Sequence, residues 1–271
     1  MVKKEKEREF EKKEKIREVE EEKVKKKLEP VVEKELEFEE KEETKGVRRE
    51  SREEREKAER ISSWIPKTTL GKEVKEEKIK NVDEIFEKNL RILEPEIADK
   101  LLPNLESDLI NIGQAKGKFG GGKRRPWRQT QKKTAEGNVP TFACMAVVGD
   151  KNGHIGWGYG KAKETVPAKQ KAIRNAKLNL LKIKRGCGSF DCMCNEPHSI
   201  PMKAVGKVGS VVVKLMPAPK GTGLVIDYEC KKMLRLAGIK DIYSKAFGQT
   251  RTKINMVKAT AEALKKLDEF V

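Results

Sequence analysis

The stretch VPTFACMAVVGDKNGHIGWGYG, residues 139–160, decides the fold of the middle of this chain. Residues 139–149 form an apolar strand candidate, and residues 154–160 return as its partner. Between them, residues 150–153 contain Asn-Gly, the dipeptide most favoured in two-residue hairpin turns. The three glycines of the second strand indicate that another part of the chain approaches its backbone closely.

The segments on either side complete a first unit. Residues 164–184 carry apolar side chains at helical spacing and basic side chains elsewhere, which predicts an amphipathic helix. Upstream, residues 108–114 alternate well enough for a short strand. The order β–β–β–α is therefore predicted over residues 108–184.

A second unit with the order β–β–(β)–α–β–α is predicted over residues 199–271. Its strands and helices are expected at 199–206, 209–216, 229–237, 239–247 and 254–267. The first of these helices should end at Gly238, because glycine is the usual residue just beyond a helix C-terminus. Residues 185–198 form a Cys/Gly-rich connector between the units. The predicted fold class is α+β.

The N-terminal part differs in composition. Residues 1–60 hold 21 Lys and Arg against 22 Asp and Glu, with apolar residues too sparse for a heptad repeat. They predict a charged extension, helical or disordered, and both a partner-binding tail and an unspecific solvated extension stay open. Residues 61–107 form a helical segment in which Asp83 is a candidate N-cap and residues 96–102 are a second short helix.

The charge of the chain points to a polyanionic partner. The net charge is +17, and residues 61–271 hold 40 basic against 22 acidic residues. A basic folded region attracts nucleic acid above all, although a surface that is basic only for solubility is an alternative. With 36% hydrophobic and 39% charged residues, the chain suits small domains plus a polar segment.

A cytosolic location is expected. The chain has no apolar run of about 18 residues, the length that a membrane span needs. Residues 1–15, MVKKEKEREFEKKEK, have no apolar core of a secretory signal. The five cysteines do not suggest a disulfide framework, so a reduced protein is the natural interpretation.

Residues 116–133, KGKFGGGKRRPWRQTQKK, predict an exposed RNA-binding loop. Cations neutralise phosphates, glycines let backbone amides approach them, and Trp127 can stack on an unpaired base. A disordered cationic loop without a specific target is the alternative. The candidate RNA contacts are Lys116, Lys118, Gly120, Gly121, Gly122, Lys123, Arg124, Arg125, Trp127 and Arg128.

Two further glycine–lysine stretches are candidate phosphate sites. GWGYGKAKE, residues 156–164, ends a strand and opens a helix, and helix N-termini favour phosphate. PAPKGTG, residues 217–223, is a loop with one lysine. Glycines that serve only tight turns are the alternative in both. The candidate contacts are Gly158, Gly160, Lys161, Lys163, Lys220, Gly221 and Gly223.

Four soft or borderline metal ligands fall within twelve residues: Cys187, Cys192, Cys194 and His198. Three thiolates and one imidazole can close a tetrahedral zinc site. The spacing differs from that of paired CxxC knuckles, so ordinary loop cysteines are the alternative to zinc.

No catalytic constellation is recognisable in the sequence. Only two histidines are present, and the G-x-S-x-G, HExxH and Walker patterns are absent. We therefore expect no enzymatic activity.

From about Trp64 to its end, the chain resembles the small-subunit ribosomal protein S-five family in its archaeal form. The stretches that carry the resemblance are residues 64–71, 120–127, 148–163, 185–188, 197–201, 217–224 and 236–239. Residues 164–167 contain one residue more than the bacterial pattern, as in archaeal members. Residues 1–60 lie outside the family pattern, and nothing carries over to them.

The resemblance implies a first domain similar to double-stranded-RNA-binding domains and a second, two-layer domain with a left-handed βαβ crossover. It implies a constituent of the small ribosomal subunit that binds its ribosomal RNA, supports assembly and influences decoding accuracy near the messenger RNA entrance. The implied neighbours are ribosomal proteins of the S-four and S-eight families. Residues 118–128 and the turn around Lys161 are the implied RNA contacts, and the ribosome in the cytoplasm is the implied location.

Two other classes of function stay open. A free-standing double-stranded-RNA-binding regulator would carry the same basic unit but would not co-sediment with small subunits. An enzyme is the third class, because the fold of the second domain also occurs in small-molecule kinases. Residues 220–223 lack nearby carboxylates that would serve as partners for a metal and a base.

Overall fold

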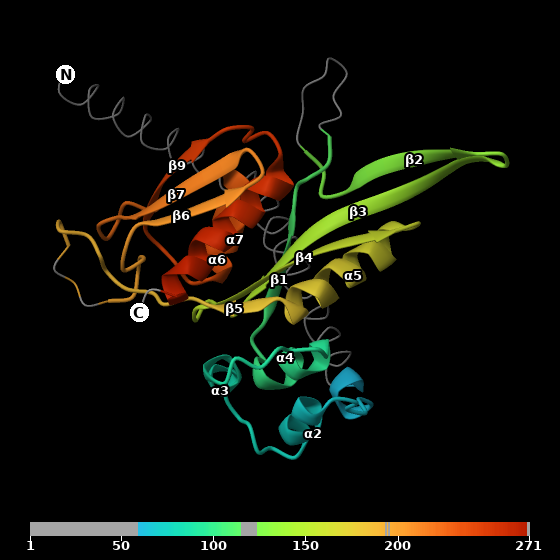
Figure 1. The fold of residues 1–271 in the computed structure, drawn as a ribbon, viewed down its shortest axis with the longest axis horizontal. Coiled ribbons are helices and arrows are strands. Elements are labelled where there is room, and N and C mark those ends of the chain that lie inside the picture. The colour runs from blue at the N-terminus through green and yellow to red at the C-terminus, as the bar shows by residue number, and fades with distance from the viewer. Residues whose placement is uncertain (1–58, 115–123, 193, 195, 270–271) are drawn as a thin grey trace, which may run out of the picture. The chain divides into compact units, whose positions relative to one another are not determined.

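The computed structural model describes residues 59–114, 124–192, 194 and 196–269. The chain divides into two compact units, residues 1–63 and 64–271. The predicted charged extension over residues 1–60 lies outside the described residues except at its end. All the helices and strands labelled in Figure 1 belong to the second unit.

Three short helices open the second unit. They are α2 (Thr69–Lys75), α3 (Val82–Glu87) and α4 (Pro95–Leu101). Thr68 caps α2, because its Oγ1 accepts the backbone N–H of Gly71 at 3.1 Å. The predicted cap of the next helix was wrong, since Asn81 precedes α3 and Asp83 lies in its first turn.

The first sheet carries one long helix. Its strands are β1 (Glu106–Ile110), β2 (Arg128–Thr134), β3 (Gly137–Gly149), β4 (His154–Ala162) and β5 (Leu180–Lys182), and the helix is α5 (Thr165–Leu178). The path is β1-β3-β4-β5, with β2 paired to the first half of β3. The predicted hairpin of β3 and β4 is confirmed, and α5 covers one face of the sheet (Figure 1).

Two strands of this sheet were not predicted. The stretch expected to be loop up to residue 133 forms β2, because every residue from Arg128 to Thr134 pairs with β3. The helix expected over residues 164–184 ends at Leu178, and the chain turns back as β5 to pair with β4. Both differences from the prediction arise because the segment pairs with a neighbouring strand. Such pairing leaves no trace in the local periodicity of the sequence.

The second sheet lies on two helices. Its strands are β6 (Ala204–Val208), β7 (Val211–Pro217), β8 (Leu224–Val225) and β9 (Ile242–Phe247), and the helices are α6 (Tyr228–Leu236) and α7 (Lys253–Glu269). The sheet order is β6-β7-β9-β8, with β8 and β9 parallel. The predicted element order is confirmed.

Three predicted strands of this sheet begin later than expected, and the one expected from residue 209 begins at Val211. Residues 199–203 form no strand, and Ser199 makes an isolated bridge to Gly186 instead. Residues 239–241 form neither helix nor strand, and the backbone N–H groups of Lys240 and Asp241 donate to the carbonyl of His198 at 2.9 Å and 3.1 Å.

One apolar core joins the two sheets. A single cluster of buried residues contains Ile110, Met145 and Ile155 of the first sheet together with Leu215 of the second sheet and Met233 of α6. Burial of apolar surface is the main favourable term in folding. The two sheets are therefore held in a fixed relation, and loops at their margins are positioned by this shared core.

Candidate nucleic-acid interface and metal centre

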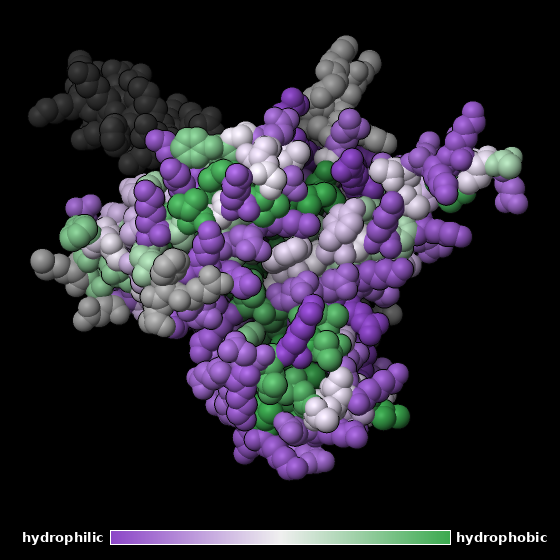
Figure 2. Space-filling view, in the orientation of Figure 1, coloured by the Kyte–Doolittle hydropathy of each residue, from purple (hydrophilic) through white to green (hydrophobic). Residues whose placement is uncertain are grey.

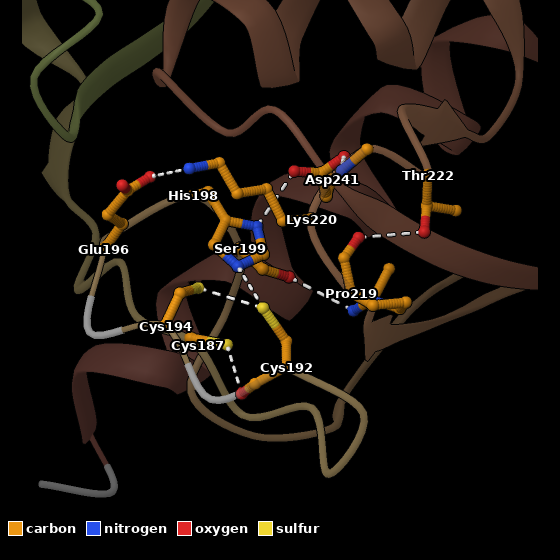
Figure 3. Close-up of polar contacts among 12 residues, drawn as sticks. Cys187, Cys192, Cys194, Glu196, His198, Ser199, Pro219, Lys220, Thr222 and Asp241 are labelled. Atoms are coloured by element: carbon orange, nitrogen blue, oxygen red, sulfur yellow. Dashed lines mark hydrogen bonds and ion pairs between the residues drawn. The ribbon is translucent and has the colours of Figure 1, made fainter.

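The predicted metal ligands meet in the connector that precedes β6. The ligand atoms of Cys187, Cys192, Cys194 and His198 all lie within 4.8 Å of one another. Figure 3 shows the three sulfur atoms and the imidazole directed toward one another. Cys192 Sγ lies 3.0 Å from Cys194 Sγ and 3.7 Å from His198 Nε2. The structure thus brings together all four side chains predicted from the sequence.

Two of the neighbouring thiols differ in acidity. The hydrogen bond from Cys194 lowers the pKa of Cys192 to about 6. The same bond raises the pKa of Cys194 to about 11. The thiolate is the form of cysteine that binds metal. Cys192 is therefore already prepared as a ligand near neutral pH.

A buried carboxylate orients the histidine of the cluster. His198 Nδ1 lies 2.9 Å from Asp241 Oδ2, and both side chains are buried. Donation from Nδ1 to this carboxylate leaves the lone pair of Nε2 directed at the cysteines. Asp241 was not predicted, because nothing in the spacing of the sequence connects it to the cluster 43 residues away.

The same carboxylate holds the loop of residues 217–223. Asp241 Oδ1 accepts the backbone N–H of Gly223 at 2.7 Å and of Gly221 at 3.1 Å. These amides, predicted as phosphate donors, are thus occupied within the protein. Lys220 Nζ lies at the surface, 2.7 Å from Glu196 Oε2. With the two amides occupied, this exposed ammonium is the group through which the loop can contact an anion.

The glycine-rich strand β4 is packed against α5. A Cβ atom at Gly158 would lie 2.3 Å from the carbonyl oxygen of Ala172, and one at Gly160 would lie 2.4 Å from that of Ala168. The predicted close backbone approach is confirmed, and the approaching element is α5. Gly158 and Gly160 are buried, whereas Lys161 and Lys163 beside them are exposed.

The predicted cationic loop is described only in its second half. Lys116, Lys118, Gly120, Gly121, Gly122 and Lys123 lie outside the described residues. Arg125 and Arg128 are exposed, and Trp127 is half-buried against the core cluster that contains Cys144. Hydrophilic side chains gather along the β2–β3 hairpin and around its base on the face seen in Figure 2.

Both histidines are engaged within the protein. His154 Nδ1 lies 2.6 Å from Asp150 Oδ2, and its Nε2 lies 3.2 Å from Asp83 Oδ1. His198 is held by Asp241, as described above. In the part of the chain that the structure describes, no helix is long and apolar enough to cross a membrane.

These features define a basic α+β protein with exposed cationic loops, the class to which structural RNA-binding proteins belong. Residues 127–184 match the family model of the ribosomal protein S5 N-terminal domain, and residues 206–271 match that of the ribosomal protein S5 C-terminal domain. The chain belongs to the ribosomal protein S5 family, in its archaeal type.

Three archaeal relatives, each called small ribosomal subunit protein uS5, illustrate the similarity. That of Nanoarchaeum equitans is 53% identical over 207 residues, covering 76% of this chain and 89% of the relative. That of Hyperthermus butylicus is 49% identical, covering 77% and 91%. That of Methanocaldococcus jannaschii is 48% identical, covering 77% and 89%. This family is structural and non-enzymatic, as the sequence led us to expect.

Proposed function

We propose that the protein is a structural constituent of the small ribosomal subunit that binds its ribosomal RNA. The observation that carries the proposal is the 53% identity to a small ribosomal subunit protein over 76% of the chain. The basic character of residues 61–271 agrees with it, because their excess of cations suits a polyanion.

The proposed mechanism is positional. Cations hold RNA by its phosphates and riboses, which reads the shape of A-form helices rather than their sequence. Among the described candidates, the exposed cations Arg125, Arg128, Lys161, Lys163 and Lys220 supply such contacts. Residues 116–123 are proposed for the same role from the sequence.

For the metal cluster we propose zinc. Three sulfur atoms and one imidazole nitrogen form a donor set that zinc prefers. The lowered pKa of Cys192 favours its thiolate, which is the form that binds a metal cation. Bound zinc would cross-link residues 187–198 and so fix the connector between the two sheets. Its role would be structural, since four protein ligands leave no open position for a substrate.

The finer family features are also proposals. We propose that residues 108–184 form a double-stranded-RNA-binding-like domain and residues 199–271 the S-five-type domain, with residues 61–107 and 185–198 as the helical segment and the connector. The parallel unit β8–α6–β9 is the proposed site of the left-handed crossover. Proteins of the S-four and S-eight families, nearby messenger RNA, an effect on decoding accuracy and a cytoplasmic location complete the proposal.

Sedimentation of the tagged full chain with ribosomal subunits under rising salt tests the function. We expect the protein to travel with the small subunit. Its affinity for a small-subunit ribosomal RNA fragment should fall steeply with salt, because each neutralised phosphate releases counterions. Soluble, unbound protein that binds any RNA duplex would favour a free-standing regulator instead, and a flat salt dependence would contradict both.

Elemental analysis of gently purified protein tests the zinc. We expect one zinc per chain, lost in Cys192→Ser. Cys144→Ala is the matched control, because Cys144 is a buried residue of β3 that does not belong to the cluster. Protein without metal and with a Cys192–Cys194 disulfide would contradict the proposal.

A further inference from the structure

A groove of about 1140 Å³ lies beside the base of the β2–β3 hairpin. Residues of the segment 124–131 line it from the first sheet, and Arg251 of the β9–α7 loop lines it from the second. Arg124 joins the two sides, since its Nη1 donates to the backbone carbonyl of Arg251 at 3.3 Å. The groove is thus assembled from segments more than a hundred residues apart in the sequence.

The charges that line the groove all have one sign. Arg124, Arg125, Arg128 and Arg251 line it, and the described residues that line it include no Asp or Glu. In the described residues, none of these arginines forms an ion pair with a carboxylate. Like charges held together without a counter-charge repel one another, so an anion in the groove would stabilise them. Guanidinium groups suit phosphate in particular, because their planar donors match its oxygens in pairs.

The rest of the lining suits nucleobases. Trp127 and Phe142 are half-buried and contribute aromatic surface. Gln129 is the cross-strand partner of Phe142, so an amide lies beside a ring on the same face of the hairpin. Aromatic faces stack on any base, and amide side chains both donate to and accept from base edges.

We propose that this groove binds an unpaired strand of RNA, with Arg251 as a contact contributed by the β9–α7 loop. The inference rests on the proposed function and names its ligand at this place. An RNA duplex keeps its bases stacked inside and offers a shallow minor groove, whereas an unpaired strand can enter a cleft and splay its bases. The volume exceeds the range of about 300–1,000 Å³ typical of sites for single small ligands. It therefore has room for more than one nucleotide.

The test uses the full chain and a labelled oligouridine of about 10 nucleotides, within the range of single-strand site sizes. Arg251→Ala is expected to weaken its binding about tenfold, the effect of losing a charged hydrogen bond. The slope of log affinity against log salt should fall by about 0.7, the value for one phosphate of a single strand. Cross-links from 4-thiouridine should map to Trp127 or Phe142.

Arg235→Ala is the matched control, because it removes an exposed arginine of α6 that does not line the groove. Its binding and salt slope should stay as in the unsubstituted chain. Equal losses in both variants would overturn the inference, and so would displacement of the RNA by polyglutamate at equal charge. If the oligouridine fails to bind while a structured small-subunit RNA fragment still binds, this inference fails and the proposed function stands.

Discussion

The imidazole of His198 and the carboxylate of Asp241 form a buried hydrogen bond, with Nδ1 2.9 Å from Oδ2. The second oxygen of the same carboxylate accepts the backbone N–H groups of Gly221 and Gly223. One side chain therefore orients the histidine of the Cys/His cluster and holds the loop that carries Lys220. The cluster and the loop should respond together when Asp241 is changed.

Asp241→Asn is expected to weaken both. Zinc affinity should fall about 10- to 100-fold, the usual effect of removing the carboxylate behind a metal-binding histidine. Hydrogen exchange at the amides of Gly221 and Gly223 should accelerate, because a neutral amide oxygen is a weaker acceptor. Chelator competition measures the first and exchange mass spectrometry the second. Asp191→Asn, an exposed acid of the connector, is the control and should change neither. A loss of zinc without faster exchange would show that the two are not coupled.

Gly158→Ala should lower stability sharply. A Cβ atom there would lie 2.3 Å from backbone atoms of both Ala172 and Ala176, so α5 would have to move off the sheet. We expect a loss of at least about 1–3 kcal/mol in the free energy of unfolding, as for overpacked cores. Gly186→Ala is the control, because its nearest neighbours lie at 3.5 Å. Equal melting temperatures for the two variants would mean that α5 shifts to accommodate the added Cβ atom without a loss of stability.

The β3–β4 hairpin, the element order over residues 199–271 and the Cys/His cluster were predictable because their signals are local. Asn-Gly between two apolar runs marks the β3–β4 turn, and four ligands within twelve residues mark the cluster. The close approach to the β4 glycines was predictable too, although the sequence did not say which element makes it.

The remaining features depend on distant residues. Residues 128–134, RQTQKKT, are polar along their whole length and mostly exposed, so no alternation marks β2. Leu180 and Ile183 continue the apolar spacing of α5, and this hid β5 inside the predicted helix. Arg251 joins the groove through a contact with Arg124, 127 residues away. These features are determined by pairing with a partner strand and by packing between the sheets. Neither can be recognised from a short stretch of sequence.

Glu229→Ala should loosen the junction between the two sheets. The buried carboxylate accepts the backbone N–H of Asn111 at 2.8 Å and its side-chain amide at 3.0 Å, so it ties α6 to the end of β1. Its removal leaves two buried donors unpaired, at about 1–3 kcal/mol each. Urea unfolding should show a loss of about 3 kcal/mol, and the exposed Glu262→Ala should stay within about 0.5 kcal/mol. A similarly small loss in the free energy of unfolding for both variants would show that Glu229 does not stabilise the junction between the sheets.

His154 should make the stability of the protein depend on pH. Its hydrogen bond to Asp150 raises the pKa of the imidazole above the ordinary value of 6.5, and a second bond to Asp83 adds to this. Lys182 also faces Asp83 at 2.7 Å, so this carboxylate serves two cations. Because the folded-state pKa is raised, the stabilisation is fully present below pH 6.5 and is lost as the pH rises through the raised value.

The comparison that isolates this effect is His154→Gln, which keeps a hydrogen-bond donor but carries no charge at any pH. The free energy of unfolding of the two proteins should differ most at a pH below 6.5, and less at a pH above the raised pKa, where the imidazole is neutral in both states. Asp150→Asn should shrink the same difference at the lower pH, since it removes the main partner. If the difference between the two proteins is the same at both pH values, the imidazole is not charged in the folded protein and the network is held by neutral hydrogen bonds alone.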